Sequence, residues 1–135
     1  MTIVHVMLRV LDFEASKGFY GALGLREMDR YSFPDFRVCY LADEAGMQIE
    51  LIENVGRTQA YQVGDGFGNV AFAVPDAAAT RNAMIGAGAQ PGAIKEIYHG
   101  GRLFARYFHA TDPDGYRVEI LEQIGRWRNI PPTES

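Results

Sequence analysis

The sequence has a single cysteine, no long apolar run and no excess of basic residues, and each of these absences excludes a class of protein. One cysteine cannot form an intrachain disulfide, which predicts a reducing compartment, the cytoplasm. No apolar run approaches the roughly 20 residues of a membrane-spanning helix, and the N-terminus lacks the blocks of a signal peptide. The net charge of −4 is spread along the chain. We therefore expect neither a membrane nor a nucleic-acid partner.

The length of 135 residues predicts one domain, or two small modules that share a core. Cys39 lies in the nearly continuous apolar run 36–41. This position favours a small buried hydrophobe over a reactive nucleophile.

The segment Thr2–Val10 has the β-branched and long apolar residues of a strand. Alternation along a strand places His5, Met7 and Arg9 on one face. A histidine and an arginine on one face combine a possible metal ligand with a possible anion-binding group. A half-exposed strand with an incidental histidine is the alternative.

The rest of the chain predicts two modules with the same order of elements. In the first, we expect strands at 2–10, 25–31, 36–41 and 47–53 and a helix at 12–22. In the second, we expect strands at 67–74, 93–99, 103–110 and 116–122 and a helix at 77–87. The resulting division of the single domain 1–135 is a first module 1–54, a connection 55–66, a second module 67–123 and a loosely docked tail 124–135.

The second module repeats the first with a shift of 64 positions. The repeat aligns a strand, an aspartate that caps a helix and a glycine that ends it. The aligned pairs are His5 with Asn69, Asp12 with Asp76, and Gly24 with Gly88.

Each module also ends with an acid inside an apolar strand, Glu50 in QIELIE and Glu119 in RVEILE. A carboxylate flanked by Ile, Val and Leu is costly to bury unless a cation or charged partners compensate. Two such acids at matching places predict a cation site or a proton-transfer site between the modules.

Four motifs resemble those of the vicinal oxygen chelate superfamily, and within it the glyoxalase I (lactoylglutathione lyase) family. They are His-x-Met-Leu-Arg-Val-x-Asp at 5–12, Phe-Tyr-x-x-Leu-Gly-Leu at 19–25, Ile-Glu-Leu-x-x-Asn at 49–54 and Asp-Pro-Asp-Gly-Tyr-x-Val-Glu-Ile at 112–120. The resemblance covers residues 3–122. It implies an α+β fold of paired βαβββ modules, whose curled mixed sheets enclose a divalent metal. Chains this short in the family are usually homodimers with active sites built across the subunit interface, so the resemblance implies a homodimer with shared active sites.

The resemblance also implies roles for individual residues. His5 and Glu50 match metal ligands of the first module, and Glu119 matches a ligand that also transfers the proton. Arg9 and Asn54 match positions that bind glutathione. The implied reaction converts the hemithioacetal of methylglyoxal and glutathione to S-lactoylglutathione.

The chain departs from the family pattern at two places. Asn69 stands where the family has its fourth ligand, a histidine, and His99 stands where a lysine commonly precedes Gly-Gly; His99 could help to hold a substrate anion. An amide oxygen binds more weakly than imidazole and favours harder cations, so Asn69 shifts the expected metal from Ni, Zn or Co toward Mn, Fe or Mg. His109 is predicted to be structural.

Two other functions remain open from the sequence. The chain could be another enzyme of the superfamily, such as an epimerase, a thiol transferase or a ring-cleaving dioxygenase. It could also be a metal-free binding protein of the bleomycin-resistance type. The three residues His5, Glu50 and Glu119 favour an enzyme, whereas Asn69 argues against an unaltered glyoxalase I.

Overall fold

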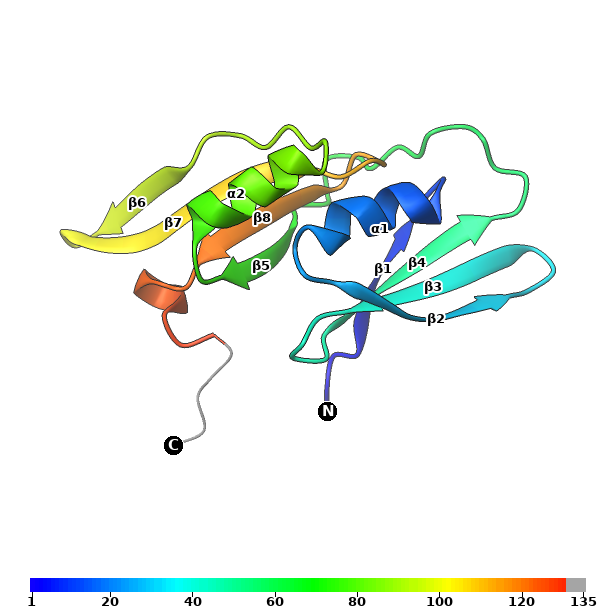
Figure 1. Cartoon of the computed structure of the whole chain (residues 1–135), viewed down its shortest axis with the longest axis horizontal. Helices are drawn as coiled ribbons and strands as arrows, with labels where there is room; N and C mark the ends of the chain where they lie inside the picture. The colour runs from blue at the N-terminus through cyan, green and yellow to red at the C-terminus, as the bar shows by residue number, and fades with distance from the viewer. Residues whose placement is uncertain (131–135) are drawn as a thin grey trace. The chain divides into compact units, whose positions relative to one another are not determined.

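The computed structural model describes residues 1–130, which form two compact βαβββ units (Figure 1). The first unit comprises residues 1–63 and 113–115. The second comprises residues 64–112 and 116–130. No helix in the described part of the chain is long and apolar enough to span a membrane.

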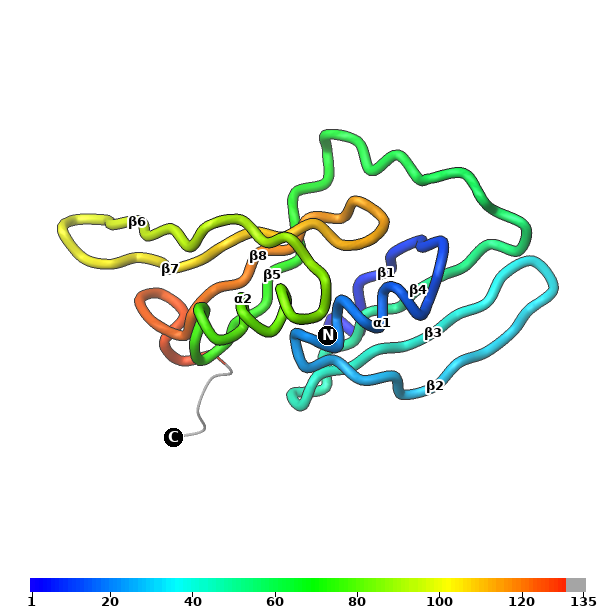
Figure 2. Tube along the Cα trace, turned by 45° about the horizontal axis from the view of Figure 1, so that its top comes forward, coloured from blue at the N-terminus to red at the C-terminus, as the bar shows by residue number. Residues whose placement is uncertain are grey.

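The first unit is a four-stranded mixed sheet with one helix. Its elements are β1 (His5–Arg9), α1 (Phe13–Gly21), β2 (Arg26–Ser32), β3 (Phe36–Ala42) and β4 (Gln48–Asn54). The strand order is β1-β4-β3-β2. The edge strand β1 runs parallel to β4, while β4, β3 and β2 are antiparallel neighbours. Figure 2 shows how β2 and β3 follow each other as a hairpin.

The second unit has the same topology. Its elements are β5 (Val70–Val74), α2 (Ala77–Gly86), β6 (Lys95–His99), β7 (Arg102–Thr111), β8 (Arg117–Glu122) and the 3₁₀ helix η1 (Gly125–Trp127). The strand order β5-β8-β7-β6 repeats that of the first sheet, again with a parallel edge strand. The predicted α+β class of paired βαβββ modules is therefore confirmed. The first strand of this unit is shorter than predicted, because pairing starts at Val70 rather than at residue 67.

The helix in the first unit begins where two carboxylates satisfy its free backbone N–H groups. Asp12 is the N-cap, and its side chain accepts from the backbone N–H of Glu14 at 2.9 Å. Glu53 reaches across from β4 and accepts from the N–H of Phe13 at 2.7 Å. Arg37 on β3 forms an ion pair with the same Glu53. The predicted aspartate cap is confirmed, and a second acid that the sequence reasoning had not assigned supports it.

The second unit reproduces this arrangement at the matching positions. Asp76 caps α2 by accepting from the N–H of Ala79 at 3.1 Å. Glu122 on β8 accepts from the N–H of Ala77 at 2.9 Å and pairs with Arg106 on β7. A negative charge at a helix N-terminus is favourable because the helix dipole is positive there. The second glutamate of each QIELIE-like strand thus anchors a helix and leaves the first glutamate for another role.

The two faces of the first sheet differ in the way that alternation predicts. Leu8 on β1 and Val10 directly after it are 2% and 1% exposed and belong to the core. Their neighbours Met7 and Arg9 face an open cavity on the opposite side. The face that carries Arg9 is therefore the face available to a ligand.

Cys39 on β3 is fully buried, as predicted. Its thiol donates a hydrogen bond to Oε1 of Glu27 on β2, with an Sγ–O distance of 3.1 Å. Burial, reinforced by the hydrogen bond to this carboxylate, raises the pKa of Cys39 to about 12. The thiol is therefore protonated throughout the neutral range.

The prediction that the whole tail is loosely docked is wrong for its first part. Residues Gly125–Trp127 form η1, and the Trp127 ring packs edge-on against Phe104 of β7 with 5.4 Å between centroids. Gly125 has a φ of +57°, and a Cβ built on it would lie 2.3 Å from the Phe104 carbonyl oxygen. Only glycine fits this approach without strain. Residues 131–135 of the predicted tail lie outside the described residues.

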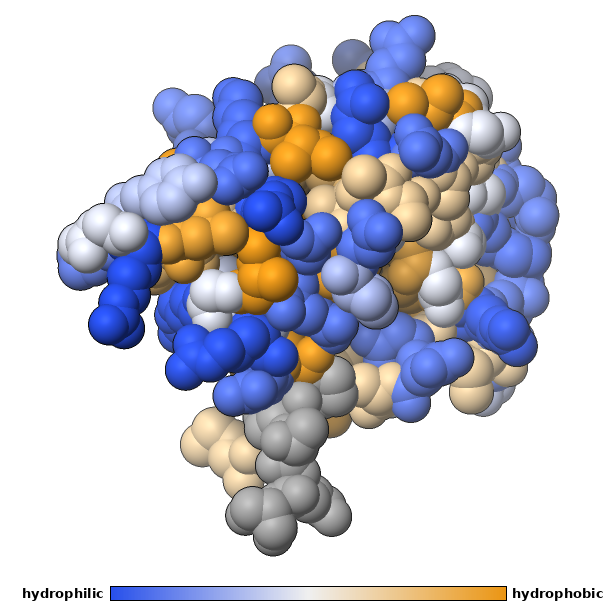
Figure 3. Space-filling model, turned by 60° about the vertical axis from the view of Figure 1, so that its left-hand side comes forward, coloured by the Kyte–Doolittle hydropathy of each residue, from blue (hydrophilic) through white to orange (hydrophobic). Residues whose placement is uncertain are grey.

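The β6–β7 hairpin carries apolar side chains that are exposed in this chain. Ile97 and Tyr98 on β6 are 43% and 64% exposed, and Phe104 on β7 is 37% exposed. The face drawn in Figure 3 shows apolar atoms interrupted by hydrophilic ones. Such scattered surface apolar groups are normal in proteins and carry no argument by themselves.

Replacing Gly125 tests the docking of η1. Gly125→Ala should lower the free energy of unfolding by about 2–4 kcal/mol, because the new methyl group meets backbone and the positive φ is strained. Gly18→Ala is the matched control, since a Cβ at this helical position meets nothing within 4 Å. The control should raise the free energy of unfolding by about 0.5–1 kcal/mol. Denaturant titration measures both, and equal stability of the two variants would contradict the packing of η1 on β7.

Alkylation of Cys39 tests the burial of the thiol. At pH 9, where an ordinary thiol of pKa 9.0 is half ionised, native protein should resist iodoacetamide while denatured protein reacts fully. A raised pKa in the folded state also means that the thiol stabilises the fold below pH 9 and loses that contribution as the pH rises toward 12. Glu27→Gln should leave the thiol protected, because burial is the larger cause. Mass spectrometry counts the adduct, and rapid modification of native protein would refute the burial.

Candidate functional site

The first unit places His5 beside Glu50 on one face of its sheet. The parallel pairing of β1 with β4 sets Met7 opposite Glu50, so His5, two residues earlier, points to the same side as the acid. His5 Nε2 lies 3.6 Å from Glu50 Oε1. The side chains are 31% and 17% exposed, so neither is fully buried. An imidazole and a carboxylate that are far apart in the sequence are thus brought together.

Tyr40 on β3 is the second partner of Glu50. The antiparallel register sets Tyr40 opposite Glu50, and the phenol donates to Glu50 Oε2 at 2.5 Å. This hydrogen bond to a carboxylate raises the pKa of Tyr40 to about 12, with burial adding to the effect. Tyr40 is therefore a permanent donor at neutral pH, and it holds one oxygen of Glu50 while the other faces His5. The sequence reasoning missed this residue, although the alternation of strand 36–41 beside strand 47–53 carried the signal.

Glu50 also lines a cavity of about 490 Å³ within the first unit. Its polar lining consists of Arg9, Tyr40, Glu50 and Asn54. Its apolar lining consists of Met7, Tyr31, Phe33, Phe36, Val38 and Ile52. A cavity of this size, largely apolar with a few convergent polar groups, is typical of small-molecule sites. The structure thus brings three of the sequence-predicted site residues, Arg9, Glu50 and Asn54, to one cavity.

Asn54 ends β4 at the edge of this cavity and contacts the segment that follows. Its side-chain amide donates to the hydroxyl of Tyr61 at 3.0 Å. The Arg57 guanidinium lies over the Tyr61 ring, 4.3 Å from its centroid. Part of the predicted connection 55–66 is therefore held against the cavity rim through Asn54.

The second unit pairs Glu119 with His109. These residues face each other across the antiparallel strands β8 and β7, and His109 Nε2 lies 3.1 Å from Glu119 Oε2. Each side chain is 24% exposed. The parallel neighbour of Glu119 on β5 is Ala71. The acid of the repeat thus also has an imidazole beside it, although His109 was predicted to be structural.

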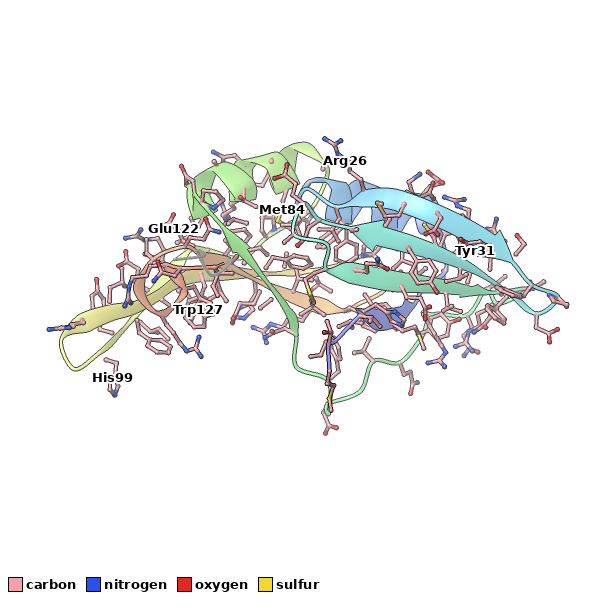
Figure 4. The ribbon with its side chains drawn as sticks, turned by 90° about the horizontal axis from the view of Figure 1, so that it is seen from below. Arg26, Tyr31, Met84, His99, Glu122 and Trp127 are labelled. Carbon is pink, nitrogen blue, oxygen red and sulfur yellow. The ribbon has the colours of Figure 1, made fainter. Side chains whose placement is uncertain are left out.

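Asn69 and His99, the other predicted site residues of this unit, lie elsewhere. Asn69 is exposed and directly precedes the first paired residue of β5. His99 ends β6 opposite Arg102 and is exposed at the tip of the hairpin, where Figure 4 shows its side chain directed away from the ribbon. Six residues of β7 separate Arg102 from His109, a distance of roughly 23 Å along an extended strand. The second unit therefore does not bring His99 to Glu119.

The predicted metal ligands are divided between the two units. His5 and Glu50 belong to the first, whereas Asn69 and Glu119 belong to the second. Within residues 1–130, the structure gathers no group of three or more His, Cys, Asp or Glu side chains around a point that could hold a metal. What each unit holds is one imidazole–carboxylate pair. The four-residue ligand set stays a prediction.

Comparison with known proteins identifies relatives over nearly the whole chain. A model of the glyoxalase/bleomycin resistance protein/dioxygenase superfamily matches residues 2–120. A probable lactoylglutathione lyase of Synechocystis is 31% identical over 90% of this chain and 95% of its own length. The lactoylglutathione lyase of Haemophilus influenzae is 33% identical over 90% of this chain and 93% of its own. The crystal structure of glyoxalase I from Zea mays superposes with a TM-score of 0.78 at 24% identity, covering 90% of this chain and 44% of that one, and so supports the fold.

Proposed function

Because the chain belongs to the glyoxalase/bleomycin resistance protein/dioxygenase superfamily, we propose that it is a metal-dependent lyase of the glyoxalase I type. Its substrate is the hemithioacetal of methylglyoxal and glutathione, and its product is S-lactoylglutathione. The observation that carries the proposal is the cavity in which Glu50, paired with His5, opens toward Arg9 and Asn54. The relatives named lactoylglutathione lyase supply the reaction class.

The residues present fit a divalent cation. Imidazole nitrogen and carboxylate oxygen are the common ligands of Zn, Ni, Co, Mn and Fe. His5 and Glu50 present such atoms 3.6 Å apart, and Glu119 offers a partly exposed carboxylate from the second unit. His5, Glu50 and Glu119 would hold the ion, with Asn69 as the predicted fourth ligand. When bound, the cation would stabilise the negative charge that develops on the substrate oxygens.

The protein's own groups bind the substrate and move the proton. Arg9 presents a planar fork of donors that matches a substrate carboxylate, and the Asn54 amide adds polar contacts at the same cavity. The apolar lining, which includes Phe33 and Ile52, offers an apolar surface against which the substrate packs. Glu119 removes the proton from the carbon next to the carbonyl and returns it to the neighbouring carbon.

We propose further that two chains form a homodimer with shared active sites and that the enzyme works in the cytoplasm. The resemblance to glyoxalase I supports the dimer, and the predicted ligands belong to two different units of the chain. The lone buried thiol supports a reducing compartment. We also propose that His99 contacts the substrate. Because it is exposed at the tip of its hairpin, a movement of the hairpin or of the partner chain would have to bring it to the substrate.

Asn69 favours a second candidate, another enzyme of the superfamily with a different substrate. The fourth ligand position carries an amide rather than an imidazole, which changes the metal preference that the usual reaction requires. Metal analysis followed by the hemithioacetal assay separates the two. Bound metal without hemithioacetal turnover would favour the second candidate, and absence of metal under every loading condition would favour a binding protein.

Replacing Glu119 tests the proton-transfer role. Glu119→Gln should lower kcat by roughly 100- to 10,000-fold, because the amide cannot accept the proton. Circular dichroism and thermal unfolding should stay close to the wild type, since the replacement is nearly isosteric. The control is Glu44→Gln in the exposed β3–β4 turn. Formation of the thioester product is followed by its ultraviolet absorbance, and retention of most activity by Glu119→Gln would exclude it as the base.

Replacing Arg9 tests substrate binding. Arg9→Met should lower kcat/KM by roughly 10- to 100-fold, mainly through a higher KM, because a charge-assisted hydrogen bond to the substrate is lost. The matched control Arg26→Met removes an exposed arginine of β2 that lies outside the cavity lining. Unchanged steady-state kinetics of Arg9→Met would show that the substrate carboxylate binds elsewhere.

A further inference from the structure

The His109–Glu119 pair occupies a distinctive place in the repeat. A shift of 69 positions relates Glu50 to Glu119 and, on the neighbouring strand, Tyr40 to His109. Both acids sit directly opposite that neighbour in the antiparallel register. In the first unit the neighbour is a phenol that only donates a hydrogen bond. In the second unit it is an imidazole, which can bind a metal through nitrogen.

The two units carry their imidazole on different strands. In the first unit it comes from the parallel edge strand, as His5. The equivalent of His5 in the second unit is Asn69, which lies outside the paired residues of β5 and has no imidazole to offer. His109 restores an imidazole beside the acid from the opposite flank of β8. Each unit therefore keeps one imidazole and one carboxylate within reach of each other.

The distances suit ligation in both units. Two ligands of one tetrahedral zinc-like ion, each about 2.0–2.2 Å from it, lie about 3.3–3.6 Å apart. The nitrogen–oxygen separation is 3.1 Å for His109 and Glu119 and 3.6 Å for His5 and Glu50. The His109 side chain is 24% exposed, so the imidazole is not fully covered by the protein.

We propose that His109 is the second unit's imidazole ligand and binds the divalent cation together with Glu119, in the role that Asn69 cannot fill. The inference rests on the proposed metal-dependent function. It assigns a ligand from β7, the strand on the far side of Glu119 from β5.

Zinc binding tests the assignment without using turnover. The Zn²⁺ dissociation constant is measured by competition with a coloured chelator, and X-ray absorption spectroscopy of the Zn²⁺-loaded protein counts the coordinated imidazoles. Wild type should show two imidazoles. His109→Gln should leave one imidazole and weaken Zn²⁺ binding by more than roughly 100-fold. Loss of a group that only orients a ligand weakens metal binding by roughly 10- to 100-fold, so the larger loss indicates a direct ligand.

Three further variants make the test specific. Asn69→Ala should keep two imidazoles, and His99→Gln, at the distant hairpin tip, should keep both the count and the affinity. The double variant Asn69→His/His109→Gln should recover most of the lost affinity, because it returns an imidazole to the β5 side of the same acid. Recovery would exclude misfolding as the cause of the loss.

The outcomes separate this inference from the function on which it rests. One imidazole in the wild type, or an unchanged count in His109→Gln, overturns the role of His109 while the metal-dependent function stands. Failure of the wild type to bind Zn²⁺, Ni²⁺, Co²⁺ or Mn²⁺ overturns both.

Discussion

Each of the two sheets depends on the carboxylates of one inner strand, β4 or β8, which carries a glutamate on each of its two faces. On the helix side, Glu53 is neutralised by Arg37 and by the N-terminus of α1, and Glu122 has the same two kinds of partner. On the other side, Glu50 has Tyr40 and His5. A carboxylate that is mostly removed from water is stable only with such partners. The helix-side acids therefore fix the helix on the sheet, and the acids of the opposite side remain available for a ligand.

Much of the fold follows from short-range signals in the sequence. Asp12 and Asp76 cap their helices because an aspartate side chain reaches the free N–H groups of the first turn. The alternation in TIVHVMLRV separates Leu8 and Val10 from Met7 and Arg9 because strand geometry has a period of two. The repeat then predicts a second sheet of the same topology. These features need no knowledge of distant contacts.

The features that the sequence did not predict depend on register between strands. Tyr40 meets Glu50, and His109 meets Glu119, only because each antiparallel pair closes with a ten-residue separation. A slip of one residue would turn either side chain to the other face. Gly125 likewise needs the nearby Phe104 carbonyl to explain its presence. The family motifs lie on β1, α1, β4 and β8. They therefore include neither Tyr40 on β3 nor His109 on β7.

The chemistry of the site changes with the strand that provides the imidazole. A set of one imidazole, two carboxylates and an amide carbonyl favours hard cations such as Mg²⁺ and Mn²⁺, because three of the four donors are oxygen. A set of two imidazoles and two carboxylates favours Zn²⁺, Ni²⁺ or Co²⁺. With His109 as ligand, the site keeps two nitrogen donors even though Asn69 stands in place of the family's histidine. The second unit's nitrogen donor then comes from β7 rather than from the β5 side of β8. Asn69 would then indicate that the second imidazole ligand lies elsewhere in the unit, at His109. The site would still prefer Zn²⁺, Ni²⁺ or Co²⁺, as expected for two imidazoles and two carboxylates.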